Sequence, residues 1–276
     1  MNNVVVRSIS GVVFILAMLA CLMFNKFLFA GLIIFIMSVM LLEFYHITMG
    51  NSYTFYKVLA IIAAIFLFGL LFATASYHIP IRFVAFAMVP IFIVMINSLY
   101  VKDKDEYGKF SNIYTGLLYI AVPIALSNLI AFDKAGNFSG NLLLCFFIII
   151  WCSDVGAFAF GISLGKIFPQ KLFPSVSPKK TWIGFIGGLV SSVLAAFALY
   201  EFGILKFPLI HCLILSFIMS VTGVYGDLFE SQWKRVYGVK DSGKIIPGHG
   251  GFLDRFDSTL MAMPFGAIYL AIFDLL

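Results

Sequence analysis

The chain of 276 residues is 62% hydrophobic, is only 11% charged, and has a mean hydropathy of +1.05. A soluble domain carries roughly 25% charged residues, so this chain has too few charges to cover a water-facing surface. The composition therefore excludes an ordinary soluble domain and predicts an all-α, polytopic membrane protein with lipid over most of its surface. The net charge of +5 is modest, and we expect no nucleic-acid partner.

Apolar segments of spanning length follow one another along the chain, and we expect about nine transmembrane helices. They cover residues 4–24, 27–45, 58–76, 80–100, 113–131, 141–164, 182–202, 208–229 and 257–275. The first two are joined only by Asn25 and Lys26, so a short tilted hairpin there would change the count to eight or ten. No A-x-A-like cleavage site follows the first segment, which favours an uncleaved span over a signal peptide. No linker separates a soluble domain, so residues 1–276 are expected to form a single integral membrane domain.

Lysine and arginine are distributed unequally between the two sides that nine spans define. One side, with the N-terminus and the even-numbered connections, holds 14 of the 18. The other side holds only Lys26, Arg82, Lys134 and Lys206. The positive-inside rule then places the N-terminus and the long loops in the cytoplasm. Two of these cytoplasmic loops, at residues 166–181 and 230–257, concentrate the polar residues of the chain.

The first polar loop contains four lysines and no acid. Pro178 restricts Ser177 to an extended conformation, and Lys179, Lys180 and Thr181 then lead into the next span. The N-terminus of a helix with lysines beside it binds anions well. The loop therefore offers a phosphate site, although positive charges that anchor the protein at the lipid headgroups would produce the same pattern.

The second polar loop and its flanks mix acids, bases and glycines. The acids are Asp227, Asp241, Asp254 and Asp257, and the bases are Lys234, Arg235, Lys240, Lys244 and Arg255. Carboxylates without Cys or His partners suit a hard cation, above all Mg²⁺, and lysines and arginines beside them suit phosphate oxygens. The glycines around His249 allow the backbone to approach a ligand closely. Together these residues predict a site for nucleotide phosphates, with solvated loop charges as the alternative.

Acids within spans or at their ends add to this hypothesis, because a charge without a partner is costly there. Asp227 lies at a span end, and it shares one helix face with Ser231 and Lys234 if the helix continues. Asp154 lies inside the sixth span and is a functional candidate, with a structural partner among lysines or hydroxyls as the alternative. Glu43, at the end of the second span, is expected to be an interfacial residue.

The spacing within the second polar loop resembles the signature of a known family. The pattern is Ser231-x2-Lys-Arg-x4-Lys240-Asp241-x-Gly243-x3-Pro247-Gly-His-Gly-Gly-x2-Asp254-Arg255-x-Asp257. It resembles the signature of the phosphatidate cytidylyltransferases, also called CDP-diacylglycerol synthases. The Ser-Pro-Lys-Lys-Thr stretch at 177–181 and the Asp154 segment resemble that family in order and spacing. The first 140 residues resemble it only in being hydrophobic.

The resemblance implies transfer of CMP from CTP to phosphatidic acid, which forms CDP-diacylglycerol and pyrophosphate. It implies Asp227 and Asp254 as Mg²⁺ ligands, with Asp241 and Asp257 as further ligands or orienting groups. The residues expected to hold the phosphates are Lys179, Lys180, Lys234, Arg235, Lys240 and Arg255, of which Lys240 and Arg255 join the four acids in the expected catalytic set. His249 is expected to orient a phosphate or the leaving pyrophosphate. The further residues expected to contact substrate are Asp154, Ser177, Thr181, Ser231, Lys244, Gly250 and Gly251.

The resemblance also implies the setting in which the site works. Its members are similar in forming homodimers and in using a divalent metal, sometimes with a monovalent cation such as K⁺. We therefore expect a protein of the bacterial cytoplasmic membrane whose active site faces the cytoplasm. Residues 1–140 would form N-terminal spans, and residues 141–276 would carry the catalytic spans and loops.

Two other functions compete with this interpretation. A CDP-alcohol phosphotransferase would also combine Mg²⁺ with a lipid nucleotide, but its D-G-x2-A-R…G-x3-D-x3-D pattern is absent from the sequence. A transporter or channel would be expected to place its polar groups near mid-membrane, often with internal repeats. This chain instead gathers its polar residues at one predicted face.

Overall fold

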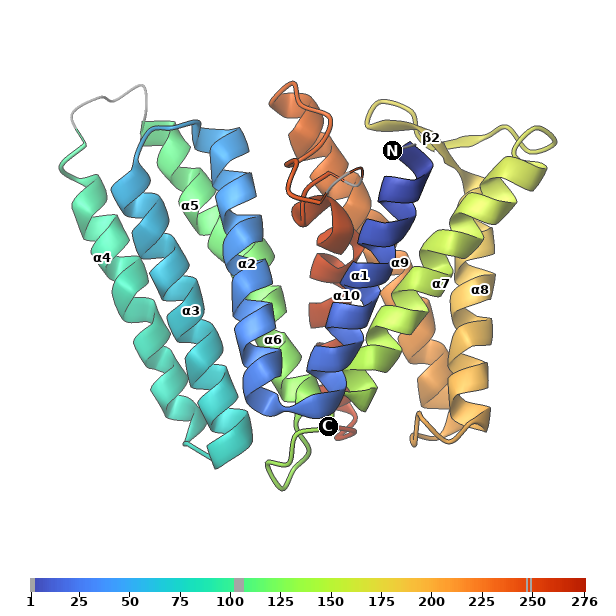
Figure 1. Ribbon diagram of the computed structural model, residues 1–276, viewed down its shortest axis with the longest axis horizontal. Coiled ribbons are helices and arrows are strands. Elements are labelled where there is room, and N and C mark those ends of the chain that lie inside the picture. Colours follow the sequence, from blue (N-terminus) through green and yellow to red (C-terminus); the bar gives the residue numbers. More distant parts are fainter. Residues whose placement is uncertain (1–2, 102–106, 247, 249) are drawn as a thin grey trace. The chain divides into compact units, whose positions relative to one another are not determined.

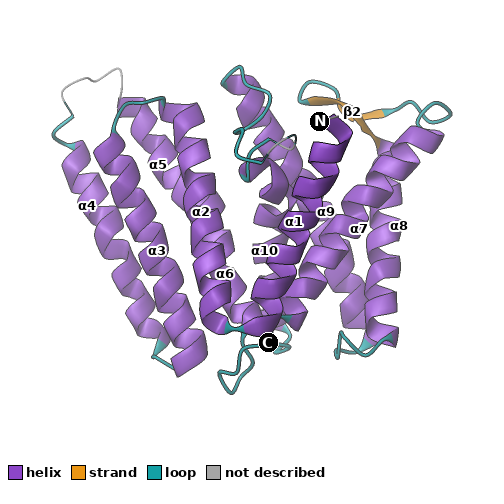
Figure 2. Cartoon of the chain, in the orientation of Figure 1, coloured by secondary structure: helices purple, strands orange, loops and turns teal. Residues whose placement is uncertain are grey.

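The computed structural model describes residues 3–101, 107–246, 248 and 250–276, and helices make up most of this part of the chain (Figures 1 and 2). The chain forms two compact units. The first comprises Met1–Ser139 with Asp241–Arg255, and the second comprises Gly140–Lys240 with Phe256–Leu276. Part of the second polar loop therefore packs with the N-terminal helices, whereas the rest of the C-terminal half forms a unit of its own.

The first unit contains the helices of the N-terminal half. They are α1 (Asn3–Phe24), α2 (Lys26–Met49), α3 (Thr54–Tyr77), η1 (Ile81–Ala87), α4 (Met88–Ser98), η2 (Tyr107–Phe110), α5 (Ser111–Gly116), η3 (Leu117–Ala121) and α6 (Val122–Ala131). The last four follow one another without a break. The turn η3 is π-helical and lies directly before Pro123, whose missing N–H interrupts the regular hydrogen-bond ladder at this point.

Close packing holds α2 against the α5–α6 segment. Tyr45 of α2 is fully buried, and its hydroxyl donates to the carbonyl oxygen of Ile113 over 3.0 Å. Its ring occupies the space that a side chain at Gly116 would need. A buried tyrosine hydroxyl usually requires such a partner. Helix α3 packs against α2, α4 and α6 and completes the group (Figure 1).

The second unit contains four helices and a small sheet. Its elements are α7 (Asn141–Leu164), β1 (Lys171–Phe173), β2 (Ser177–Thr181), α8 (Trp182–Glu201), α9 (Leu209–Val236) and α10 (Leu253–Ile272), the last from Phe256 onward. The two strands are antiparallel, with Lys171 opposite Thr181 and Phe173 opposite Ser177. This hairpin forms the connection between α7 and α8 (Figure 2).

Helices α7 and α8 approach each other closely because small residues line their contact. A side chain at Gly156 of α7 would overlap Ser191 of α8, and one at Gly187 would overlap the ring of Phe160. On a neighbouring contact, the hydroxyls of Ser153 in α7 and Ser220 in α9 lie 2.7 Å apart in a buried position. Small residues and hydroxyl hydrogen bonds are typical of helix contacts in membranes, where water provides no hydrophobic driving force between helices.

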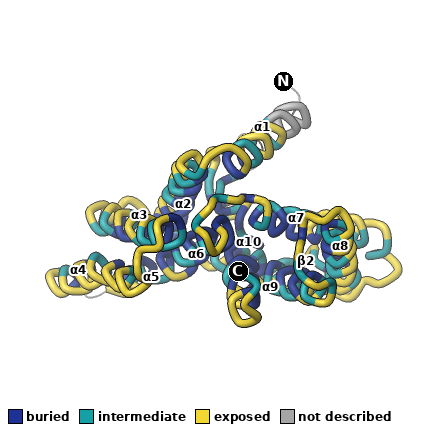
Figure 3. Tube along the Cα trace, turned by 90° about the horizontal axis from the view of Figure 1, so that it is seen from below, coloured by how far each residue is buried: buried dark blue, intermediate teal, exposed yellow. Residues whose placement is uncertain are grey.

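Large apolar side chains remain exposed on helices of both units, and Figure 3 shows exposed positions along these helices. In α4 only Val94 and Ser98 are buried, whereas Phe92 and Ile96 are more than half exposed. In α8 the side chain of Leu194 is 61% exposed. Continuous apolar surface of this kind is not stable in water and suits contact with lipid chains.

Seven helical segments among the described residues are long and apolar enough to cross a membrane. They are Lys26–Met49, Thr54–Tyr77, Ile81–Ser98, Tyr107–Ala131, Asn141–Leu164, Trp182–Glu201 and Leu209–Val236. Each coincides with a predicted span, so the prediction of a helical protein with several membrane-spanning helices is confirmed. The described apolar part of α1 is shorter, and α10 is not among the seven, so the predicted count of nine is not confirmed.

The structure corrects the sequence prediction at the first polar loop and makes it more specific at the second. The first loop forms a β-hairpin, so the fold is not purely helical. At the second loop, α9 continues past the predicted span end to Val236, and α10 begins at Leu253. The condition under which Asp227, Ser231 and Lys234 share one helix face is therefore met. Hydropathy marks where apolar residues stop, whereas the helical hydrogen-bond ladder continues as long as polar residues one turn apart support it.

Replacing Gly156 by Ala is expected to loosen the packing of α8 on α7. The new methyl would overlap Ser191 and lie 2.7 Å from the carbonyl oxygen of Gly187. Overpacking of this kind costs about 1–3 kcal/mol, so we expect a lower apparent midpoint of thermal unfolding in detergent. Gly69→Ala in α3 is the matched control, since a methyl there meets no atom within 4 Å. Equal midpoints for the two variants would contradict this packing.

Candidate functional site

Two polar segments of the sequence meet in the second unit through an ion pair. The Nζ of Lys180 in β2 lies 2.6 Å from Oδ2 of Asp227 in α9. Lys180 is held there because β2 runs directly into α8, and Thr181 caps that helix by accepting the N–H of Gly184 over 3.2 Å. Asp227 also accepts a hydrogen bond from the hydroxyl of Ser231, one turn later, over 3.2 Å. A lysine of the first polar loop is therefore joined to an acid that flanks the second.

Asp227 belongs to a group of four carboxylates. Asp257 in α10 interacts electrostatically with Asp227, Glu230 and Asp154, which α9 and α7 supply. The backbone N–H of Ser258 donates to Asp257 over 2.6 Å, and the Ser258 hydroxyl donates to Asp154 over 3.5 Å. Carboxylates this close repel one another, so cations placed beside them stabilise the group.

The two ion pairs of this group differ in exposure. The side chains of Lys180 and Asp227 are 26% and 31% exposed, and such a pair contributes about 0–1 kcal/mol. Lys234 and Glu230, whose charged atoms lie 2.5 Å apart, are 13% and 2% exposed. Removing one partner of a buried pair costs about 3–5 kcal/mol. Lys180 can therefore leave Asp227 for a negatively charged ligand at little cost, whereas Lys234 is engaged by Glu230.

The remaining predicted site residues of this unit lie mainly at its surface. Ser177 begins β2, and Lys179 follows it with an exposed side chain. Arg235 is exposed near the end of α9, and its Nη1 donates to the carbonyl oxygen of Val239 over 3.5 Å. Lys240 is also exposed. Because these cations are exposed, they can contact a dissolved anion without a change in the conformation of the protein.

In the first unit, the segment Asp241–Arg255 folds around the carboxylate of Asp254. The Oδ2 atom of Asp254 accepts three hydrogen bonds, from the N–H of Ser242 (2.8 Å), the hydroxyl of Ser242 (2.9 Å) and the N–H of Gly251 (2.8 Å). A hydrogen bond to a charged group contributes about 1.5–3 kcal/mol. The loop and Asp254 therefore hold each other in place.

The glycines of this segment allow the backbone to approach charged side chains. Gly250 has a φ of +85°, and a Cβ there would lie 2.6 Å from Oδ2 of Asp254. A Cβ at Gly251 would overlap the Ser242 hydroxyl. These two glycines therefore approach the protein's own side chains, and a close approach to a ligand stays a prediction. Three further predicted residues, Asp241, Lys244 and Arg255, are exposed. His249 lies outside the described residues.

Sequence reasoning assigned no role to Glu43 or Glu230. Glu43 is only 6% exposed, and its carboxylate accepts the N–H groups of Phe252 (3.1 Å) and Leu253 (2.9 Å). The signal that could have found it is a single acid within an otherwise apolar helix. Glu230 could have been found from its spacing to Lys234, since residues four apart meet on one helix face.

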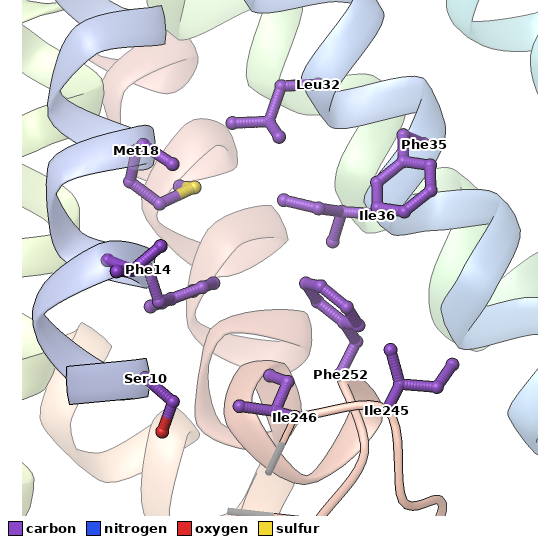
Figure 4. A pocket seen from close by; sticks show the side chains of 11 residues that line it. Ser10, Phe14, Met18, Leu32, Phe35, Ile36, Ile245, Ile246 and Phe252 are labelled. Carbon is purple, nitrogen blue, oxygen red and sulfur yellow. The ribbon is translucent and has the colours of Figure 1, made fainter. Parts of the chain in front are cut away.

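An apolar pocket of about 320 Å³ lies against the same loop in the first unit (Figure 4). Helices α1 and α2 and the loop residues Ile245, Ile246 and Phe252 line it. The ring of Phe252 lies between those of Phe14 and Phe35, with centroids 6.4 and 6.0 Å away. The segment that holds Asp254 thus presents an apolar wall to a pocket of ligand-binding size.

The carboxylates of the second unit have the donor chemistry that Mg²⁺ prefers, and their mutual repulsion favours a cation. Within the described part of the chain, no three His, Cys, Asp or Glu side chains form a ready-made cation cage. Mg²⁺ is commonly held by only one or two carboxylates, with water and substrate phosphates as its other ligands. Asp227 and Asp257 therefore fit such an ion. The pairing of Asp227 with Asp254 at one ion stays a prediction.

Thermal stability should separate the two ion pairs. Glu230→Gln leaves Lys234 without its buried counter-charge, so we expect a loss of about 3–5 kcal/mol and a clearly lower apparent unfolding midpoint in detergent. Asp227→Asn removes an exposed pair and relieves repulsion from Asp257, so its midpoint should stay near that of the parent. A midpoint for Glu230→Gln equal to that of Asp227→Asn would contradict the assigned difference.

Several known proteins are similar to this chain in sequence. A phosphatidate cytidylyltransferase of Bacillus subtilis (strain 168) is 41% identical over 182 residues, which cover 65% of this chain and 63% of the relative. Proteins of that name from Staphylococcus saprophyticus and Staphylococcus aureus (strain COL) are 45% and 46% identical over 124 residues, covering 45% of this chain and 46% of each relative. The matched part of this chain thus spans less than two thirds of these relatives' length.

The match to the family as a whole is longer than these pairwise matches. The model of the Cytidylyltransferase family fits residues 5–273, which include the helices of both units, the hairpin and the segment around Asp254. The lysine of the hairpin and the acids of α9 and α10 therefore lie within one family match. This chain belongs to the Cytidylyltransferase family.

Proposed function

We propose that this protein transfers CMP from CTP to phosphatidic acid and so forms CDP-diacylglycerol. The observation that carries the proposal is the ion pair between Lys180 and Asp227, because it joins the two polar segments in one site. The family match and the name shared by the relatives support it. In the same unit, further carboxylates and exposed cations supply the charged groups that binding of a nucleoside triphosphate requires.

The reaction needs positioning and charge neutralisation more than a protein nucleophile. A phosphate oxygen of phosphatidic acid attacks the α-phosphorus of CTP and forms a new P–O bond. The bond between the α-phosphorus and its bridging oxygen to the β-phosphate breaks, and pyrophosphate leaves with the electron pair. Both substrates are anions, so the protein must bring two phosphate groups together against their repulsion.

In this proposal Lys180 moves from Asp227 to a substrate phosphate, at the small cost expected of an exposed pair. Lys179, Arg235 and Lys240 are exposed and would add cations to the phosphates. Asp227 and Asp257 would hold Mg²⁺, which when bound supplies positive charge to the phosphate oxygens. The role of Asp254 as a second ligand, the homodimer and the monovalent cation stay predictions.

The lipid substrate also requires an apolar site for its acyl chains. The pocket lined by Phe14, Phe35 and Phe252 supports this requirement, because it lies against the loop that holds Asp254. We propose that it receives part of one acyl chain of phosphatidic acid. The reacting phosphate would then stay at the level of the lipid headgroups, where CTP from water can reach it.

Purified protein in detergent should release pyrophosphate from CTP only when phosphatidic acid and Mg²⁺ are both present, and chelation should abolish the release. Asp227→Asn should reduce turnover by about 10²-fold or more, since it removes a carboxylate at the proposed metal site. Glu201→Gln at the end of α8 is the control, because it makes the same chemical change away from the carboxylate group. Pyrophosphate release without phosphatidic acid, or normal turnover of folded Asp227→Asn, would sink the proposal.

The proposed site faces the cytoplasm, which the 14-to-4 distribution of Lys and Arg supports. In a cysteine-free background, Gln170→Cys and Lys244→Cys replace exposed loop residues and should react with a membrane-impermeant thiol reagent only from the cytoplasmic face. Asn25→Cys and Lys206→Cys, also exposed, should react only from the other face. Labelling of Lys244→Cys from the outer face would reverse the proposed orientation.

A further inference from the structure

Glu43 of α2 is a buried acid whose hydrogen-bond donors among the described residues come from the segment Asp241–Arg255. Its Oε1 accepts the N–H of Phe252 over 3.1 Å, and its Oε2 accepts the N–H of Leu253 over 2.9 Å. The hydroxyl of Ser242 lies 3.1 Å from the same Oε2. Leu253 begins α10, and the first N–H groups of a helix have no partner within the helix. Glu43 thus caps from α2 the chain that enters α10.

Ser242 connects Glu43 to Asp254. Its hydroxyl oxygen lies 3.1 Å from Oε2 of Glu43 and 2.9 Å from Oδ2 of Asp254, and it accepts the N–H of Asp254 over 3.3 Å. A serine hydroxyl has one proton and can donate to only one acceptor at a time. The two carboxylates therefore share this hydroxyl, and a change at Glu43 reaches Asp254 through a single intervening group.

The shape of the segment depends on Glu43 as well. A Cβ at Gly243 or at Gly251 would overlap the Glu43 carboxylate, so the chain closes around this carboxylate only where side chains are absent. Two glycines on opposite sides of one buried acid make an enclosure that fits a carboxylate closely. A bulkier group or one of different polarity would displace the backbone that also holds Asp254.

A carboxylate suits this position better than an amide of similar shape. Both oxygens of Glu43 accept hydrogen bonds from N–H groups. A glutamine would present an NH₂ group to one of these donors, so one buried N–H would lose its partner. The alternative is that Glu43 only stabilises the fold. The contact between Glu43 and Ser242 favours a further role in addition to stability.

We propose that Glu43 is a positioning residue for the transfer reaction, acting through Ser242 and the backbone of residues 251–253 to fix the carboxylate of Asp254. This inference rests on the proposed function and on the role in the reaction that the sequence predicts for Asp254. The inference assigns a role to α2, which lies in the part of the chain that resembles the family only in being hydrophobic. Glu43 touches no substrate and acts on the reaction only through the placement of Asp254.

The test compares Glu43→Gln and Ser242→Ala with the parent protein. Both should lower kcat by roughly 10- to 100-fold, the range typical of residues that orient a site's ligands, and should change KM for CTP less than about twofold. Ser38→Ala is the matched control. It also removes a serine hydroxyl, but one that donates to the Ile34 carbonyl within α2. Its kcat should equal that of the parent.

Hydrogen exchange supplies a readout that needs no activity. Peptides containing the N–H groups of Phe252 and Leu253 should lose protection in Glu43→Gln and keep it in Ser38→Ala. If the parent protein releases no pyrophosphate, the proposed function fails, and the exchange rates still decide whether Glu43 anchors the loop. Unchanged protection in Glu43→Gln would overturn the anchor. Lost protection with parental kcat in both Glu43→Gln and Ser242→Ala would reduce Glu43 to a structural role and overturn the proposal.

Discussion

Each carboxylate placed within these apolar helices needs a cation or a hydrogen-bond donor, because lipid supplies neither. The two units meet this requirement differently. In the second unit, lysine side chains from a hairpin and from the same helix lie beside Asp227 and Glu230. In the first unit, backbone N–H groups of one loop serve Glu43 and Asp254. The cations and hydrogen-bond donors beside these carboxylates therefore come mainly from loops that contact the helices.

The start of α10 illustrates how one arrangement satisfies several needs. The successive N–H groups of Gly251, Phe252 and Leu253 each donate to a carboxylate oxygen, from Asp254 or from Glu43. These groups would otherwise remain unpaired at a helix N-terminus, which also favours negative charge. The same hydrogen bonds thus stabilise the helix start, bury Glu43 and orient Asp254. A change at Glu43 or at Asp254 is therefore expected to affect the other carboxylate and the start of α10.

The proposed transferase site would need a rigid surround and side chains that can move where its substrates bind. The pair Lys234–Glu230 is nearly buried and belongs to the frame. The pair Lys180–Asp227 is partly exposed, and the repulsion within the carboxylate group is relieved when a cation binds. Binding of a metal and of phosphates would therefore stabilise the folded protein, as any ligand does that binds only the native state. The exposed apolar surfaces of α4 and α8 suit contact with lipid chains.

The amino-acid sequence by itself determined the class of protein, the positions of seven apolar helices and the two polar loops, because composition and hydropathy are local properties that lipid selects directly. Its motif also identified the family and pointed to Asp227, Lys180 and Asp254. Only the tertiary structure decided which of these residues meet and which further acids hold them. Glu43 and Leu253 are 210 residues apart in the chain, and no local pattern encodes their hydrogen bond. The enclosure of Glu43 by Gly243 and Gly251 depends in the same way on contact between distant segments, which forms only once the chain has folded.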